Sequence, residues 1–148
     1  NVSTMKKLKT INEEYNFELL NDDPVRPHIP HSFRISQNRK SFVLLDDDDV
    51  TPRAVICAAF TNEVARTETD LATAGNTAMF YTVWSYNKGA GRDIIFAVVE
   101  SIKQNMPEVN RFVTLSPTTE MARKFHLSNG AIELQHNGDS VNFEYKNL

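Results

Sequence analysis

The chain has 148 residues, of which 41% are hydrophobic and 24% charged, the composition of one folded domain spanning residues 1–148. Its net charge of -3 excludes the large positive field that general nucleic-acid binding needs, and its single cysteine excludes an internal disulfide. No apolar run is long enough to cross a membrane, and the first ten residues lack a secretory apolar block. We therefore expect a cytoplasmic protein without nucleic-acid or membrane partners.

The first part of the chain carries mixed signals. Residues 6–20 have apolar side chains at spacings of three and four, which predicts a helix. Three prolines then predict an irregular connection over residues 22–31. His28 and His31 lie in this connection, and the prolines oppose the helix that would bring both rings to one face. We therefore expect no metal site here.

Strand patterns follow. Residues 32–35, 41–45 and 54–60 are rich in alternating or continuous apolar side chains and are predicted strands. The four aspartates at 46–49 lack the alternating spacing and the glycine of a calcium loop, which favours an exposed hairpin tip. Cys57 lies within the last strand and is interpreted as a buried small apolar side chain rather than a nucleophile.

The second half of the chain alternates strands and helices. Residues 77–84 are apolar on both faces, which predicts a central strand after a loop over residues 61–76. The other predicted elements are a loop at 85–92, a helix at 93–104, a strand at 111–115, a helix at 118–127 and a hairpin at 132–145 that turns at Asn137-Gly138. Met121, Ala122 and Phe125 are expected to face inward.

The loop before the first of these helices is the strongest functional signal. Gly89 and Gly91 leave backbone N–H groups free where a helix begins, and the helix dipole adds partial positive charge. Lys88 and Arg92 would add further charge toward a phosphate or a diphosphate. The alternative is that the glycines merely permit a tight turn. The loop is not a P-loop, and Ile94 stands where a dinucleotide fingerprint has its third glycine.

Two motifs resemble the GNAT-type N-acetyltransferase superfamily. Tyr86-Asn87-Lys88-Gly89-Ala90-Gly91 is similar to its Gln/Arg-x-x-Gly-x-Gly/Ala coenzyme A loop, and the spacing Ala122-x-x-x-His126-x-x-x-Gly130 is similar to part of its second motif. The resemblance covers roughly residues 41–145. It implies an α/β (α+β) fold with a mixed, mainly antiparallel sheet, helices on both faces and a splayed central strand pair.

The same resemblance implies that coenzyme A or acyl-CoA is the cosubstrate, bound where the central strands diverge, and that no metal is needed. The cofactor-binding residues that it implies are Val83, Trp84, Asn87, Lys88, Gly89, Ala90, Gly91 and Arg92. Phe80, Tyr81 and Trp84 are interpreted mainly as core side chains, one of which lines the acyl or pantetheine slot. Arg123 and Lys124 are expected to complete a basic pocket with Lys88 and Arg92.

A narrower resemblance joins three stretches to the acyltransferase-like C-terminal domain of malonyl-CoA decarboxylases: TAMFYTVWSYNKGAG, FAVVESIKQNMPEV and RFVTLSP. In that family the serine of Leu-Ser-Pro and the histidine of Phe-His-Leu-x-Asn-Gly-Ala are catalytic, which implicates Ser116 and His126. The chain departs from the family at Thr118-Thr119-Glu120, where the decarboxylases have Pro-Gly-Phe, and no counterpart of their helical domain is found.

The implicated residues also have structural interpretations. His126 stands at the spacing of the superfamily's proton-donating tyrosine, and an ordinary imidazole titrates near pH 6.5, but the residue is equally explained as a half-exposed helix position. Ser116 or Thr118 would suit a helix cap. Glu63 and Tyr86 are candidates for a general base because they fall near strand ends.

Three functions follow from these resemblances. The first is an acyl-CoA-dependent acyltransferase that moves an acetyl or other short acyl group from coenzyme A to an unidentified amine. The alternatives are a malonyl-CoA decarboxylase-like activity and a noncatalytic domain that binds coenzyme A or a partner. Residues 12–31 and 63–76 would select the acceptor, and a homodimer stays open.

Overall fold

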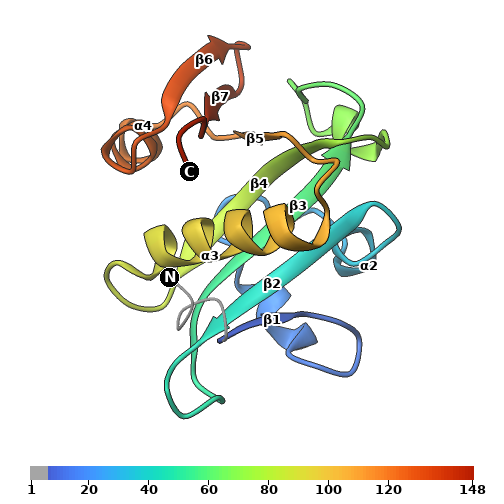
Figure 1. Ribbon diagram of the computed structural model, residues 1–148, viewed down its shortest axis with the longest axis vertical. Coiled ribbons are helices and arrows are strands. Elements are labelled where there is room, and N and C mark those ends of the chain that lie inside the picture. The colour runs from blue at the N-terminus through green and yellow to red at the C-terminus, as the bar shows by residue number, and fades with distance from the viewer. Residues whose placement is uncertain (1–6) are drawn as a thin grey trace.

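The computed structural model describes residues 7–148, whose seven strands form one sheet in the order β1-β2-β3-β4-β5-β7-β6 (Figure 1). The strands are β1 (Leu8–Thr10), β2 (Arg39–Leu45), β3 (Pro52–Thr61), β4 (Thr77–Ser85), β5 (Arg111–Thr114), β6 (Ile132–His136) and β7 (Val141–Glu144). Only the β4–β5 pair is parallel among these strands. The expected mixed, mainly antiparallel sheet is confirmed.

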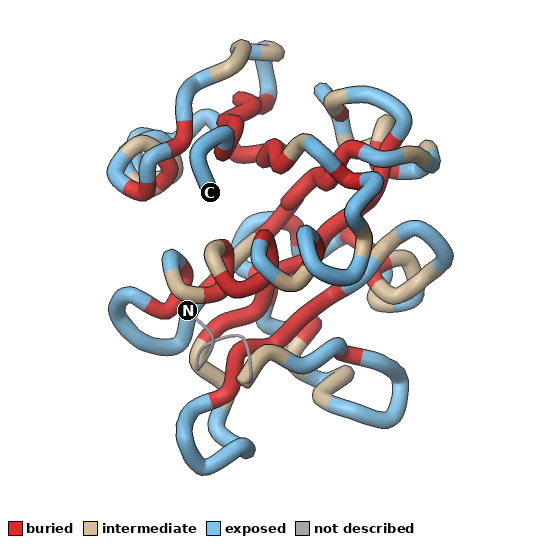
Figure 2. The backbone as a smooth tube through the Cα atoms, in the orientation of Figure 1, coloured by how far each residue is buried: buried red, intermediate tan, exposed pale blue. Residues whose placement is uncertain are grey.

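Helices cover both faces of the sheet, as expected. They are the 3-10 helices η1 (Phe17–Asp22) and η2 (Thr69–Ala72) and the α-helices α2 (His31–Arg34), α3 (Ala90–Asn105) and α4 (Glu120–Ser128). One core cluster joins α3 to the face of β3 that carries Ile56, and two side chains of α4, Phe125 and Leu127, pack against it. The other core cluster joins η1 and η2 to the face of β3 that carries Cys57. Figure 2 shows the central strands buried along most of their length.

The parallel pair separates toward the end of β4. Its last residue pair is Phe80 with Thr114, followed by one hydrogen bond from Leu115 N–H to Phe80 O (2.9 Å). The register between β3 and β4 shifts at the same level, which leaves Tyr81 as the extra residue of a β-bulge. We call the space between residues 81–85 and residues 115–119 the fork. It is the splayed strand pair that the resemblance implies.

Two predicted elements are wrong. The helix predicted over residues 6–20 does not form within the described residues 7–20: Leu8 pairs with Leu44 in an edge strand, and helical structure begins only at Phe17. Residues 32–35 are not a strand, because Phe33 lies in the short helix α2. Neighbouring elements override the local apolar pattern of both segments. Residues 8–10 pair with β2, whose outer backbone groups need hydrogen-bond partners. Residues 31–34 follow Pro30, which favours the start of a helix.

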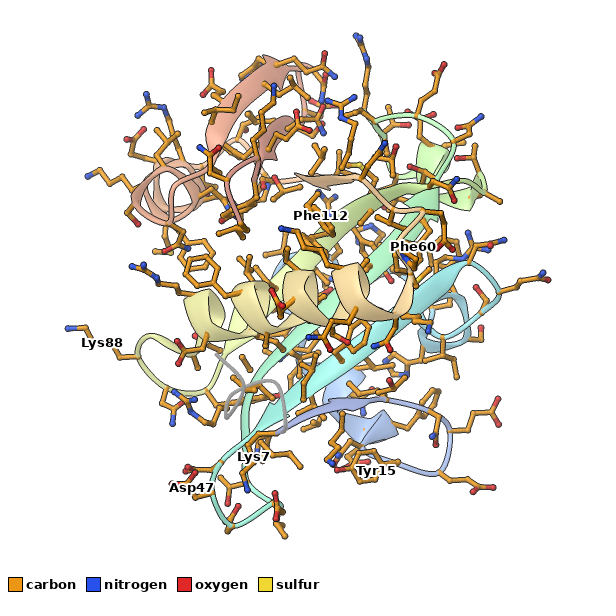
Figure 3. The ribbon with its side chains drawn as sticks, viewed as in Figure 1. Lys7, Tyr15, Asp47, Phe60, Lys88 and Phe112 are labelled. Carbon is orange, nitrogen blue, oxygen red and sulfur yellow. The ribbon has the colours of Figure 1, made fainter. Side chains whose placement is uncertain are left out.

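The structure also places several single residues that the sequence singles out. The aspartates at 46–49 are exposed at the tip of the β2–β3 hairpin, where Figure 3 shows Asp47 beside Lys7. Cys57 is fully buried, as predicted. His28 contacts Glu68 (2.7 Å), and no group of three or more metal-ligating side chains occurs within residues 7–148. Over the same residues, no helix combines the length and the apolar character of a membrane span.

Candidate active site

A cavity of about 380 Å³ occupies the fork. Its walls come from β4, the residues after β5, the first turn of α3, α4 and residues 24–25. Ser116 and His126 both line it, so the structure brings together the two residues that the decarboxylase resemblance implicates. None of the described residues that line the cavity is Asp, Glu, Lys or Arg. The cavity is therefore apolar, with a few uncharged polar groups.

Helix α4 carries His126 on its inner face. The helix begins after Thr119, whose Oγ1 accepts a hydrogen bond from Ala122 N–H (3.2 Å), so the predicted caps Ser116 and Thr118 are wrong. His126 is 5% exposed and stacks on Phe143, which excludes a half-exposed helix position.

Met121 lies on the outer side of the same helix. It is 83% exposed at the rim of the cavity, although we expected it to face inward. The helix turns His126 rather than Met121 toward the sheet, because these positions are five residues apart and a helix needs three or four for a shared face.

Tyr145 fixes the orientation of the His126 ring. Its hydroxyl lies 2.8 Å from His126 Nδ1. Burial lowers the pKa of His126 to about 4 and raises the pKa of Tyr145 to about 12, so both groups are neutral near pH 7. When Tyr145 donates to Nδ1, the imidazole proton resides on Nε2. His126 then offers a neutral N–H donor, and the expected titration near pH 6.5 is wrong.

Burial of neutral His126 makes stability depend on pH. The unfolded imidazole takes up a proton near pH 6.5 whereas the folded one does so only near pH 4, so the contribution is complete above pH 6.5 and is lost as the pH falls to about 4. The loss should amount to about 3 kcal/mol of the free energy of unfolding. Urea unfolding across this pH range should show a shallower acid dependence for His126→Gln. An identical dependence in both proteins would contradict the burial of neutral imidazole.

Ser116 is held firmly at the start of the other fork arm. Its backbone N–H donates to Val141 O, and its carbonyl accepts from Val141 N–H, both at 2.9 Å. Its Oγ lies 2.7 Å from Thr114 Oγ1, and the residue is 3% exposed. No hydrogen bond links Ser116 to His126 among the described residues, so the two groups face one cavity separately rather than as a nucleophile–base pair.

The glycine loop adjoins the cavity at the first turn of α3. This helix starts at Ala90, three residues before its predicted start, and is capped by Gly89 with φ +84°. A Cβ at Gly91 would lie 3.1 Å from the Phe125 ring, so glycine here permits the close approach of α3 and α4. The N–H groups of a helix's first turn have no carbonyl partner within the helix, and this suits a phosphate.

The charged side chains near this loop are only partly arranged as expected. Lys88 projects from the loop into solvent (Figure 3). The Arg92 guanidinium lies 5.0 Å from the centre of the Phe96 ring, along α3. Arg123 does not belong to a free basic pocket, because it pairs with Glu120 and Glu133 (3.6 Å each).

Neither candidate general base fits. The Tyr86 hydroxyl accepts from Trp84 Nε1 (3.1 Å) and donates to Asp22 (2.7 Å), and partial burial raises the pKa of Tyr86 to about 12. Glu63 is exposed and follows the end of β3 that pairs with the beginning of β4, whereas the cavity lies where β4 ends. Glu63 therefore lies at the wrong end of the sheet, since nearness to a strand end does not specify which end, whereas Tyr86 follows the end of β4 that borders the cavity but has both hydrogen bonds of its hydroxyl already occupied.

A buried ion pair supports the fork from the face opposite α3. Arg34 Nη1 lies 2.7 Å from Asp23 Oδ2, and both side chains are 0% exposed. Asp23 Oδ1 accepts from Thr82 Oγ1 (3.0 Å) and from the N–H groups of Val25 and Arg26. Burial alone would raise the pKa of Asp23, but hydrogen bonds from the Arg26 N–H, the Arg34 guanidinium and the Val25 N–H hold it below its usual range. Sequence reasoning missed this pair because residues 22–31 read only as an irregular connection.

Comparison with known proteins identifies relatives of this fold and site. The family model described as the malonyl-CoA decarboxylase C-terminal domain matches residues 52–139, more than half of the chain. Malonyl-CoA decarboxylase from Agrobacterium vitis has a similar structure, with a TM-score of 0.77, 17% identity, and coverage of 94% of this chain and 60% of that one. The chain thus spans about 60% of the length of that decarboxylase. No curated protein sequence matches the chain.

Acetyltransferases of known structure share the fold. AAC(6')-Ib in complex with paromomycin and acetyl-CoA has a TM-score of 0.68 at 14% identity, over 95% of this chain and 93% of that one. A Bacillus subtilis acetyltransferase in complex with CoA has a TM-score of 0.64 at 11% identity, over 96% of this chain and 99% of that one. The fold is therefore that of the GNAT acetyltransferases, and within it the chain belongs to the malonyl-CoA decarboxylase C-terminal domain family.

Proposed function

We propose that the cavity in the fork binds malonyl-CoA and decarboxylates it to acetyl-CoA, with Ser116 and His126 as the catalytic residues. The observation that carries this proposal is that two uncharged hydrogen-bonding side chains, Ser116 and His126, line the same apolar cavity beside the first turn of α3. The membership of the chain in the decarboxylase domain family supports it.

Coenzyme A would bind along the splayed side of β4. Its phosphates would be held by the first-turn N–H groups of Gly91 and Arg92, with charge from Lys88. Its pantetheine arm would lie along Val83 and Trp84, which line the cavity. The remaining members of this proposed binding set are Asn87, Gly89 and Ala90. The phosphate end would then lie outside the cavity and the thioester inside it.

Decarboxylation breaks the bond between the malonyl carboxylate and C2 of the acyl group. The electron pair of that bond moves into the thioester as an enolate while carbon dioxide leaves. The Nε2–H of neutral His126 would donate to the enolate oxygen, where negative charge develops. The Ser116 hydroxyl would give a proton to C2 and recover one from water, which completes acetyl-CoA.

The surroundings suit this reaction better than acyl transfer to an amine. An apolar cavity disfavours the compact charge of the malonyl carboxylate, and that charge spreads over the thioester as the bond breaks. Amine acylation needs a base that removes a proton from nitrogen. The pKa of His126, about 4, makes it a weak base, and no carboxylate is among the described residues that line the cavity.

Acyl transfer of an acetyl or other short acyl group to an amine is the second candidate. It is favoured by the fold, which the chain shares with an acetyltransferase bound to acetyl-CoA and with one bound to CoA, at TM-scores of 0.68 and 0.64. A noncatalytic CoA-binding domain would keep the same loop without either reaction.

The decisive experiment incubates the purified protein with malonyl-CoA and follows acetyl-CoA by chromatography and mass spectrometry. Parallel reactions contain acetyl-CoA with a panel of amines, and CoA binding is measured by calorimetry. We expect acetyl-CoA from malonyl-CoA well above the rate in buffer. Acylated amines without decarboxylation would replace the first candidate by the second, and CoA binding without either product would indicate the noncatalytic domain.

A further inference from the structure

Arg26 occupies the point where the two fork arms separate. Its Nε donates to Tyr81 O (2.8 Å) and its Nη2 donates to Leu115 O (2.9 Å). These carbonyls belong to the first residues beyond the last β4–β5 pair, where the pairing of these two strands has ended. The planar guanidinium therefore takes the place of the missing strand ladder and fills the inner end of the fork.

The guanidinium and its backbone are both fixed. Arg26 Nη1 pairs with Glu68 (2.6 Å), which balances the buried positive charge. The backbone N–H of Arg26 donates to Asp23 Oδ1 (2.9 Å), and its carbonyl accepts from Arg34 Nη2 (2.7 Å). The residue is 9% exposed. A side chain held at so many points has little freedom to move aside for a ligand.

The segment that Arg26 anchors is a wall of the cavity. Pro24 and Val25 line the cavity, as do Tyr81 and Leu115. Gly91 lines the cavity from α3, which packs on one face of the sheet. Asp23 belongs to the other face, because its carboxylate is paired with Arg34 and the Arg34 guanidinium contacts Cys57 in the core of that face. Residues 23–26 therefore lie across the fork from the loop proposed for the phosphates, where the acyl end of a thioester would point.

We propose that Arg26 anchors residues 23–26 as the acyl wall of the cavity and so restricts the bound thioester to short acyl groups such as malonyl or acetyl. This inference rests on the proposed binding of coenzyme A and adds the residue that limits the length of the acyl group. A longer chain would have to displace Pro24 and Val25 or the guanidinium between Tyr81 and Leu115.

The test measures by calorimetry the dissociation constants of CoA, acetyl-CoA and hexanoyl-CoA for the unmodified protein, Arg26→Ala and Arg26→Lys. Hexanoyl-CoA should bind the unmodified protein about 10-fold or more weakly than acetyl-CoA, because the added methylenes meet a fixed wall. Arg26→Ala should lose most of this discrimination and keep its affinity for CoA. Arg26→Lys should lose it in part, since an ammonium is a poor bridge between two carbonyls.

Arg39→Ala is the matched control. Arg39 also donates to a backbone carbonyl, that of Leu71 (2.9 Å), but Leu71 does not line the cavity whereas Tyr81 and Leu115 do, so removal of Arg39 should leave the discrimination intact. Equal affinity of the unmodified protein for acetyl-CoA and hexanoyl-CoA would overturn the proposed wall, whether or not the variants fold. An unchanged ratio in folded Arg26→Ala would do the same. Failure of the unmodified protein to bind CoA would instead remove the proposed function, and this inference with it.

Discussion

Replacing His126 with Leu, or Ser116 with Ala, should each lower the rate of acetyl-CoA formation from malonyl-CoA by about 10²- to 10³-fold. Each substitution removes one hydrogen-bond donor that would act on the thioester, in a cavity in which no described lining residue is charged. The affinity for CoA should stay within about two-fold, because these side chains would act on the thioester and not on the phosphates. Steady-state rates and calorimetry on the same samples separate the two effects.

Matched controls exist on the same elements. His136→Leu changes an exposed histidine of β6, and Ser128→Ala changes an exposed serine at the end of α4. Both should keep the full rate. Tyr145→Phe should show an intermediate loss, because it removes the hydroxyl that lies 2.8 Å from His126 Nδ1 while it keeps the aromatic packing. Full activity in both Ser116→Ala and His126→Leu would refute their catalytic roles.

Replacing Arg34 with Ala should lower the free energy of unfolding by about 3–5 kcal/mol. The substitution leaves the Asp23 carboxylate buried without its counter-ion, because both side chains of the pair are 0% exposed. Asp23 also holds Thr82 and two backbone N–H groups, so the loss spreads to the segment beside the fork.

Urea unfolding measures this effect, with Arg123→Ala as the control. Arg123 is also paired with carboxylates, but its side chain is 52% exposed, so its loss should cost about 1 kcal/mol or less. The difference between the unmodified protein and Arg34→Ala should shrink as the pH falls toward 4 and below, because the unpaired carboxyl of the variant then takes up a proton. A loss no larger than that of Arg123→Ala would contradict the buried charge pair.

Local sequence patterns predict those elements whose burial can be read from their own residues. The strand β4 is buried on both faces, and its unbroken apolar run indicates this directly. The helix α3 follows from its amphipathic spacing and from the glycines before it. By contrast, β1 and α2 depend on distant partners: Leu8 pairs with Leu44, and Arg34 is buried against Asp23. Their apolar patterns alone point to the wrong structure.

The residues of the candidate site also fall into those that the sequence indicates and those that it does not. Ser116 and His126 were implicated by short motifs that resemble a family, and the structure places both on the cavity. Tyr145 and Arg26 were missed, because they reach the site through contacts between segments that are 19 and 89 residues apart. Their own neighbours in the sequence carry no sign of these contacts.

The hydrogen bond from Arg26 Nη2 to the Leu115 carbonyl also bears on the order in which the molecule folds. It joins residues 89 positions apart, and the entropy cost of closing such a long loop must be met before the contact contributes any stability. The β2–β3 hairpin can form from nearby residues, whereas the fork needs both ends of the chain in place. We therefore expect the cavity to be among the last parts to form, so that the onset of ligand binding during refolding would report completion of the native sheet.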